Sequence, residues 1–275
     1  MPLLKKKVAV ATLAIELPAC TTTENKYIAL NLLTQGVAKF DRDYITRFVA
    51  SEYRQHNPIV EDGRIGLLQF IDSLESKHSK ITIKPIRILA EGELVMIHQQ
   101  AQVDGEDLVA IDLFKINDSK ITEHWDVIQS EITETTNGNS MTGGVAKITD
   151  LDKTAENKQL VANLIDDIFI NSNRHNLAQY IDPNYVQHSP FVPDGREGLE
   201  GFLQGLAESN TSFFYTKMHN ILAEGNFVFT QSEGVFDDTA TAFNDLWRIE
   251  DGKVVEHWDA VQAIPEEFAH GNGMF

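Results

Sequence analysis

One sequence feature limits the possible folds of this chain more than any other: its second half repeats its first half. Four short blocks of residues recur at a nearly constant distance. They are Tyr53–Pro58 with Tyr185–Pro190, Asp62–Gly66 with Asp194–Gly198, Leu89–Gly92 with Leu222–Gly225, and Glu123–Asp126 with Glu256–Asp259. The distance is 132 or 133 residues, which is too long for a solenoid repeat. The chain therefore contains two copies of one domain.

The repeat also sets the expected domain organisation. We expect an N-terminal segment at residues 1–24, a first domain at residues 25–130 and a second domain at residues 155–264. Residues 131–154 lie between the copies and contain Gly138, Gly143 and Gly144, a composition typical of a flexible linker. Residues 265–275 form a tail. A chain of 275 residues is long enough to build two hydrophobic cores.

Within each copy the hydrophobic pattern changes from helical to strand-like. In the first copy, apolar residues at helical spacing predict helices over residues 26–40 and 64–76, with a short helix ending at Phe48. Four strand-like runs follow, at residues 81–89, 94–103, 108–116 and 121–128. This order predicts an α+β fold: two tandem cone-shaped domains, each with N-terminal helices packed on a curved antiparallel sheet around a pocket.

The N-terminal segment differs from both copies. Lys5, Lys6 and Lys7 precede a short apolar run, and Cys20, the only cysteine of the chain, follows it. This layout is typical of a secretory signal, and it resembles a bacterial lipoprotein signal in which Cys20 carries the lipid. We therefore expect export and a lipid anchor at the bacterial envelope or periplasm. A cytoplasmic protein with a lone thiol is the alternative.

Charge and composition exclude several classes of partner. The net charge is −18, and such an acidic surface repels phosphate backbones. We therefore expect no nucleic-acid partner. No apolar run reaches the roughly 18 residues that a membrane-spanning helix requires. One cysteine excludes an internal disulfide and any zinc site that needs several thiolates.

The last strand-like run carries the residues best suited to catalysis. Strand alternation places His124 and Asp126 on one face and Trp125 on the other, while Asp112 and Phe114 come from the preceding run. Aspartate is uncommon in strands. In a dry pocket its pKa rises toward neutrality, as a general base requires. The second copy has equivalent residues: His257, Asp259, Trp258, Asp245 and Trp247.

The motifs occur in an order that resembles the SnoaL-like polyketide cyclase family, part of the nuclear-transport-factor-2-like superfamily. The similar motifs are His56-Asn57-Pro58, Asp62-Gly63-Arg64 and Glu123–Asp126, each with its counterpart in the second copy. The resemblance implies an aspartate acid/base in the last strand, which falls on Asp126 and Asp259, and no metal or cofactor. It also implies a pocket histidine, which falls on His56 and His188. Where the cyclases carry a further histidine, this chain has Asp112 and Asp245.

These observations predict an enzyme that acts on a small apolar carbonyl compound by aldol-type condensation, isomerisation or elimination. The expected catalytic residues are Asp126, Asp259, His56 and His188, with the histidines stabilising an oxyanion. The expected pocket residues are Asp112, Asp245, Tyr53, Tyr185, Phe114, Trp247, His124 and His257. We expect no metal, since no histidine pair has the spacing of a helical zinc site.

Two further interpretations remain open. The same pocket could serve a non-catalytic module that binds a hydrophobic small molecule at an envelope membrane, because one fold supports many functions. The two tethered copies could also pair through the open faces of their sheets, at a high effective concentration. In that case the protein is a monomer that is internally a pseudo-dimer.

Overall fold

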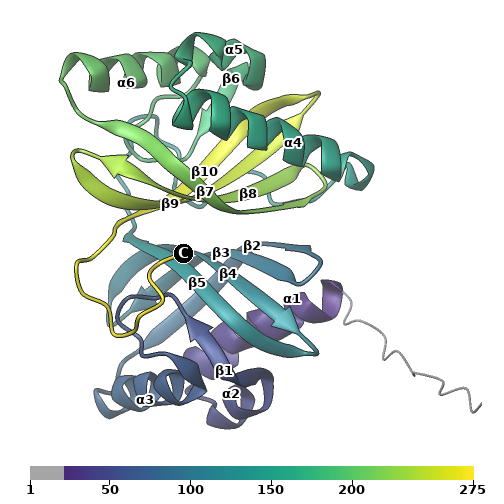
Figure 1. The fold of residues 1–275 in the computed structure, drawn as a ribbon, viewed down its shortest axis with the longest axis vertical. Helices are drawn as coiled ribbons and strands as arrows, with labels where there is room; N and C mark the ends of the chain where they lie inside the picture. The colour runs from purple at the N-terminus through teal and green to yellow at the C-terminus, as the bar shows by residue number, and fades with distance from the viewer. Residues whose placement is uncertain (1–21) are drawn as a thin grey trace, which may run out of the picture.

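The computed structural model describes residues 22–275, so the predicted signal and Cys20 lie outside the described residues. The first copy begins with helices and continues as a sheet (Figure 1). Its elements are α1 (Thr22–Asn31), a π-helical turn (Leu32–Val37), α2 (Arg42–Phe48), β1 (Val49–Gln55), α3 (Gly63–Ser76), β2 (Ile81–Glu91), β3 (Leu94–Val103), β4 (Glu106–Asn117) and β5 (Lys120–Ser130). The predicted helices and strands are present, and the predicted runs differ from them mainly at their ends.

The second copy repeats this order. Its elements are a 3-10 turn (Leu151–Lys153), α4 (Thr154–Leu164), a π-helical turn (Ile165–Ile170), a 3-10 turn (Arg174–Asn176), α5 (Leu177–Tyr180), β6 (Ile181–Gln187), α6 (Arg196–Glu208), β7 (Phe213–Glu224), β8 (Phe227–Phe236), β9 (Thr239–Glu250) and β10 (Lys253–Ala263). The predicted duplication and α+β fold are therefore confirmed. Among the helices of residues 22–275, none combines the length and the apolar character needed to cross a bilayer.

Each sheet has five strands, in the orders β1-β5-β4-β3-β2 and β6-β10-β9-β8-β7. The four long strands are antiparallel, as predicted, but β1 and β6 run parallel to their neighbours β5 and β10. The sheets are therefore mixed, because the extended run before the His-Asn-Pro motif pairs with the last strand instead of remaining a connection. This pairing places Gln55 beside His124, and Gln187 beside His257.

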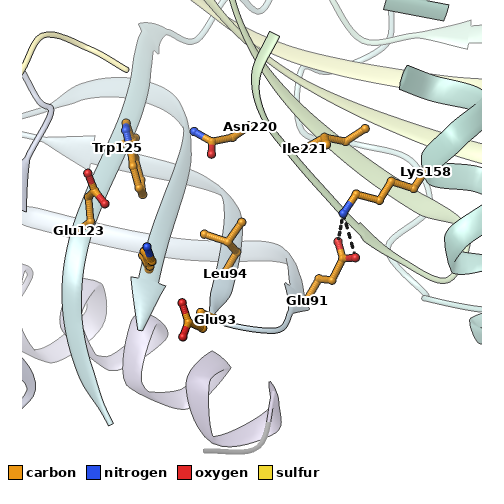
Figure 2. A pocket seen from close by; sticks show the side chains of 9 residues that line it. Glu91, Glu93, Leu94, Glu123, Trp125, Lys158, Asn220 and Ile221 are labelled. Atoms are coloured by element: carbon orange, nitrogen blue, oxygen red, sulfur yellow. Dashed lines mark hydrogen bonds and ion pairs between the residues drawn. The ribbon is translucent and has the colours of Figure 1, made fainter. Parts of the chain in front are cut away.

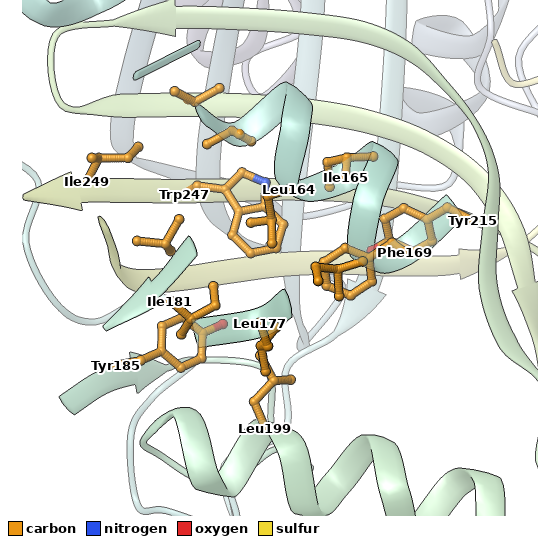
Figure 3. Packing of buried hydrophobic residues seen from close by; sticks show 14 of the residues in the cluster. Leu164, Ile165, Phe169, Leu177, Ile181, Tyr185, Leu199, Tyr215, Trp247 and Ile249 are labelled. Atoms are coloured by element: carbon orange, nitrogen blue, oxygen red, sulfur yellow. The ribbon is translucent and has the colours of Figure 1, made fainter. Parts of the chain in front are cut away.

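The helices cover one face of each sheet (Figure 1). In α3 the buried residues Leu67 and Ile71 are one turn apart, so one stripe of the helix faces the core. In the second domain Trp247 packs among apolar residues of the helices and of β6, including Leu164, Ile165 and Ile181 (Figure 3). Burying a side chain of this kind stabilises the fold by roughly 1.5–3 kcal/mol.

The two sheets pack against each other through their opposite faces (Figure 1). A third apolar cluster fills this space with residues of both domains, Trp125 and Trp258 among them. The polar contacts are reciprocal. The Ile128 amide donates to Oε1 of Gln262 at 3.0 Å, and the Val261 amide donates to Oε1 of Gln129 at 3.0 Å. Equivalent residues thus exchange roles across the interface.

The segments that follow the two sheets cross to the other domain. After the first domain, Asn139 donates its side-chain amide to the Gln187 carbonyl at 3.0 Å. After the second domain, Asn272 donates in the same way to the Gln55 carbonyl at 3.0 Å. Met141 and Met274, two residues further on in each case, are buried.

Residues 131–154, for which the composition predicted a flexible linker, make many hydrogen bonds in the structure. Their polar side chains and backbone groups are hydrogen-bonded to the second domain. The tail at residues 265–275 is held on the first domain by matching bonds. Both segments carry a Gly-Asn-x-Met sequence, at Gly138–Met141 and Gly271–Met274. In the sequence, the glycine and asparagine residues indicated an ordinary loop. The structure shows that they belong to a segment that is repeated in both copies.

Candidate active site

An Asp-His-Asp cluster lies on the helix-covered face of each sheet. The antiparallel register places Asp112 opposite Asp126, and Asp245 opposite Asp259. In each domain the histidine two residues before the last aspartate lies between them, and the ligand atoms of the three residues fall within 4.8 Å of one another. The expectation that these residues gather on one face of the sheet agrees with this geometry.

The histidine of each cluster is held by a glutamine at the end of the parallel strand. Oε1 of Gln187 lies 2.9 Å from Nδ1 of His257 and also accepts the backbone amides of His188 and Ser189. Because this oxygen can only accept, Nδ1 of His257 carries a hydrogen. Nε2 of His257 lies 3.1 Å from Oδ1 of Asp245. A proton therefore lies between His257 and Asp245, on one or the other.

The first domain has the same arrangement. Nε2 of His124 lies 3.0 Å from Asp112 and 4.0 Å from Asp126, and Nδ1 faces Gln55 at 3.2 Å. Burial lowers the pKa of His124, but the hydrogen bond to Asp112 and the charges of both aspartates outweigh it and raise this pKa above its ordinary value. Phe114 stacks on the ring with centroids 4.6 Å apart.

The cluster of the second domain opens onto a cavity of about 460 Å³. Aromatic and aliphatic side chains from the sheet and the helices form most of its wall, including Phe169, Leu199, Phe202, Leu203, Phe213, Tyr215, Phe236, Phe243 and Val261. The predicted pocket residues Tyr185, Asp245, Trp247 and His257 also line it, together with Asp259. The polar groups are thus concentrated at one place in an apolar chamber.

Asp259 carries the carboxylate atom of this wall that lacks a partner. Its Oδ1 atom is buried and has no hydrogen-bond partner among residues 22–275. Burial raises the pKa of Asp259 to about 6; the nearby Asp245 adds to this shift, while the charge of His257 and a hydrogen bond from the Ser189 side chain oppose it. A carboxyl group that titrates near neutrality can both accept and return a proton.

The equivalent aspartate of the first domain is tied down. The side-chain amide of Asn57 donates to both carboxylate oxygens of Asp126, at 3.0 and 2.8 Å. Ser189, with a shorter side chain, stands at this position in the second domain. Burial raises the pKa of Asp126, and the hydrogen bonds from Asn57 are among the effects that oppose the shift. The two copies of the site are therefore unequal.

The expected role of His56 and His188 conflicts with the geometry. His188 stacks on Trp258 with centroids 5.0 Å apart, and its Nε2 lies 3.0 Å from Glu256. Its Nδ1 lies 2.6 Å from the Ser140 carbonyl. Strand alternation places Glu256 and Trp258 on the face of the sheet opposite His257 and Asp259. His188 is not among the residues that line the cavity, so it is not placed to stabilise an oxyanion there.

His56 repeats this arrangement in the first domain. It stacks on Trp125 with centroids 4.9 Å apart, and its ring nitrogens face Glu123 at 3.0 Å and the Gly273 carbonyl at 2.9 Å. Burial lowers the pKa of His56, with the hydrogen bond to Glu123 opposing the shift. Both histidines therefore fasten the crossing segments to the domains.

Sequence reasoning missed several residues of the site. Gln55 and Gln187 precede His56 and His188 in both copies, so the repeat contained a signal for them. Tyr215 donates its hydroxyl to Asp245 at 3.2 and 3.1 Å. In the first domain the partner of Asp112 is instead Gln99, at 2.7 Å. No repeated motif marks these partners, because they lie on strands whose side chains differ between the copies.

The aspartates and histidine of each cluster are ligand types that divalent metals accept. In the second domain Asp245 and His257 already satisfy each other through a hydrogen bond, and Gln187 holds the other ring nitrogen. The geometry is that of a hydrogen-bonded His–Asp pair beside a second carboxyl group, Asp259, whose Oδ1 has no partner. A cation would bind there in competition with the shared proton.

Comparison with known proteins agrees with this fold. A family model described as SnoaL-like domain matches residues 31–124 and again residues 161–257, together more than half of the chain. No curated protein matches the chain.

Solved structures similar to one copy include TsrD from Streptomyces laurentii (19% identity, 40% of this chain and 90% of that chain, TM-score 0.36). Others are an LEH-like epoxide hydrolase of M. tuberculosis (16%, 39% and 84%, 0.36) and an NTF2-like protein from Burkholderia xenovorans (17%, 40% and 92%, 0.34). With two matches to its model, each spanning one copy of the repeat, the chain belongs to the SnoaL-like domain family.

Proposed function

We propose that the second domain is an enzyme site in which Asp259 moves a proton on a small, mainly apolar carbonyl compound. The observation that carries this proposal is the buried, unpartnered Oδ1 of Asp259 in the wall of the 460 Å³ cavity. A buried polar atom without a partner costs free energy. Substrate in the cavity would supply the missing partner.

In the proposed step, the ionised Asp259 removes a proton from the carbon next to the carbonyl group. The C–H bond breaks, an O–H bond forms on Asp259, and the electron pair moves onto the carbonyl oxygen as an enolate. The proton shared by His257 and Asp245 in the cavity wall would then be donated to that oxygen, in place of the His188 donor expected from the sequence. Return of the proton to another carbon gives isomerisation; attack on a second carbonyl gives an aldol product.

The first domain has a supporting role in this proposal. Asn57 occupies both oxygens of Asp126, and a carboxylate with two hydrogen bonds is a weaker base than a free one. We therefore assign turnover to the second domain alone.

Matched substitutions in the two domains test this assignment. Asp259→Asn should lower turnover of small carbonyl compounds by about 100-fold or more, the usual contribution of a general base. Asp126→Asn, the control, should leave turnover within about threefold of wild type. Ser189→Asn should also lower turnover, since it copies the Asn57 clamp. An active Asp259→Asn variant, or equal losses in the two domains, would contradict the proposal.

A second candidate function is capture of an apolar ligand without chemistry. The predominantly apolar wall of the cavity favours it, because such walls bind by burial of surface. Mass spectrometry of the purified protein separates the two functions. A stoichiometric apolar passenger that Asp259→Asn retains would support capture, whereas conversion of an added carbonyl compound would support catalysis.

The lipid anchor remains a separate proposal. Cys20 lies outside the described residues, and the layout of residues 1–20 is its only support. Membrane fractionation of the wild type and of Cys20→Ser tests it. An equal, soluble distribution of both would exclude lipid attachment at this position.

A further inference from the structure

An open cleft of about 490 Å³ lies between the two domains, apart from the cavity described above (Figure 2). Its wall contains residues of both copies: Glu91, Glu93, Leu94, Lys115, Glu123, Trp125, Lys158, Asn220 and Ile221. None of these residues belongs to the proposed catalytic cluster. The internal repeat shows what this cleft corresponds to.

The same groove exists on the other side of the interface, and there it is filled. Each of four residues of the open cleft has an equivalent there, 133 positions away in the sequence. The pairs are Asn220 with Arg87, Glu93 with Asn226, Glu123 with Glu256, and Trp125 with Trp258. The occupant is the segment of residues 142–149, which connects the two domains and leads into α4.

The filled groove holds this segment largely by its backbone. Nε1 of Trp258 donates to the Gly143 carbonyl at 2.9 Å. Arg87, whose guanidinium lies 3.9 Å from the centre of the Trp258 ring, donates to the Val145 carbonyl at 2.7 Å and also to the Thr142 and Gly143 carbonyls. Trp258 and Arg87 thus bind the main-chain carbonyls of three residues, Thr142, Gly143 and Val145.

Acceptors in the groove bind the amide groups of the same segment. Oε1 of Glu256 accepts the Val145 amide at 3.4 Å, and Oδ1 of Asn226 accepts the Thr149 amide at 2.8 Å. The groove therefore contacts a carbonyl, an amide two residues later and a second amide four residues after that. The segment bends at Gly144, whose φ is +81°, and has no helix or turn from Val145 to Thr149, so the pattern fits a stretch of extended peptide that follows a bend.

The open cleft presents the same kinds of group without an occupant. Trp125 is 6% exposed, and its buried Nε1 has no hydrogen-bond partner within residues 22–275. The carboxylates of Glu123 and Glu93 stand where Glu256 and Asn226 accept amides. The shorter Asn220 replaces Arg87 and leaves room in the cleft.

We propose that this cleft binds an extended peptide segment of a partner protein, with a main-chain carbonyl on Trp125 and amides on Glu123 and Glu93. Charge indicates the composition of that segment. The wall carries three glutamates against two lysines, and Lys158 is already paired with Glu91 at 2.8 Å. Leu94 and Ile221 provide an apolar surface between the charges (Figure 2). The segment therefore carries an apolar residue next to a basic one, as Lys147 and Ile148 do in the filled groove.

The indole N–H signals of the full chain test the proposal directly. The chain has three tryptophans; Trp247 and Trp258 already have hydrogen-bond acceptors for Nε1, and Trp125 has none. The probe is a peptide with the sequence of residues 142–150, acetylated and amidated at its ends. In ¹⁵N spectra it should move the Trp125 signal downfield in a saturable manner, with Trp125→Phe providing the assignment.

Substitutions in the cleft should change the affinity of the protein for this peptide, which is measured by fluorescence polarisation of a labelled peptide. Asn220→Arg rebuilds Arg87 in the open cleft and should tighten binding about fivefold or more. Trp125→Phe keeps the ring stacked on His56 but removes the donor, and should weaken binding about fivefold. The matched Trp258→Phe should leave the affinity for the open cleft unchanged.

Three results would overturn the proposal. One is the absence of a saturable Trp125 shift in both the wild type and Asn220→Arg. Another is a shift at Trp258 alone, because the peptide would then displace the built-in segment. The third is a Trp125 indole N–H that is already protected from hydrogen exchange in the free full chain, since the cleft would then be filled without a partner.

Discussion

The residue that faces the last aspartate differs between the two copies of the site. Asn57 reaches both oxygens of Asp126, whereas Ser189 leaves Oδ1 of Asp259 without a partner. The sequence showed this difference but not its consequence, because the consequence depends on the reach of an amide across the sheet. Asp126 and Asp259 could be predicted from strand alternation and from a family resemblance. His56 and His188 were misplaced because their motif lies in a loop, where alternation gives no direction.

The raised pKa of Asp259 predicts a pH-dependent effect on stability. A carboxyl group whose pKa rises from 3.8 to about 6 on folding stabilises the folded state while protonated, and this contribution is lost as pH rises through 6. At pH 8 the ionised group costs up to about 3 kcal/mol. Asp259→Asn should therefore raise the free energy of unfolding in urea at pH 8, and the gain should shrink as pH falls toward 4. A constant gain, or a loss, at all pH values contradicts the assigned pKa.

At the scale of elements, the strand that follows the helices positions the site. β6 runs parallel to β10, and this register places Gln187 beside His257. The four antiparallel strands were predictable because hydrophobic alternation and turn residues are local signals. The parallel pairing was not predictable, because it joins residues about 70 positions apart in the sequence. Its backbone hydrogen bonds also require no particular side chains. The sequence therefore indicated the face that carries the Asp-His-Asp cluster but not the element that orients its histidine.

Gln187 should contribute strongly to stability from this position. Its Oε1 accepts three donors, and its Nε2 donates to the Tyr185 hydroxyl at 2.9 Å. Gln187→Leu leaves these buried donors unsatisfied and should lower the free energy of unfolding by about 2–4 kcal/mol. Gln179→Leu, at an exposed position of α5, is the control and should change it by less than about 0.5 kcal/mol. Equal effects of the two substitutions in urea unfolding would refute this role.

At the scale of the whole molecule, the repeat determines how the domains meet. The Gln129 and Gln262 contacts are reciprocal, and so are the ion pairs Lys26–Glu224 and Lys158–Glu91, at 2.6 and 2.8 Å. Equivalent surfaces that exchange roles are typical of two-fold dimers. The sequence predicted the duplication, but the exchange of the crossing segments was hidden in stretches that resembled ordinary loops.

This interface predicts a monomer that is internally a pseudo-dimer. The faces through which two separate copies would pair are already buried against each other, in an apolar cluster containing Trp125 and Trp258. Sedimentation equilibrium should therefore give a mass near 30.9 kDa over a wide range of protein concentration. An obligate larger assembly would show that another surface controls association.

The central claim is that Asp259 has one carboxylate oxygen without a partner and titrates near neutrality inside an apolar cavity, whereas Asn57 binds both oxygens of Asp126. The most direct measurement is a carbon-13 NMR titration of the two side-chain carboxyl signals, each assigned by its asparagine variant. The account predicts a midpoint near pH 6 for Asp259, and a shift of this midpoint when Ser189→Asn introduces the clamp. The account would be contradicted if Asp259 were fully ionised at pH 4, or if its titration midpoint were the same in the wild type and in Ser189→Asn.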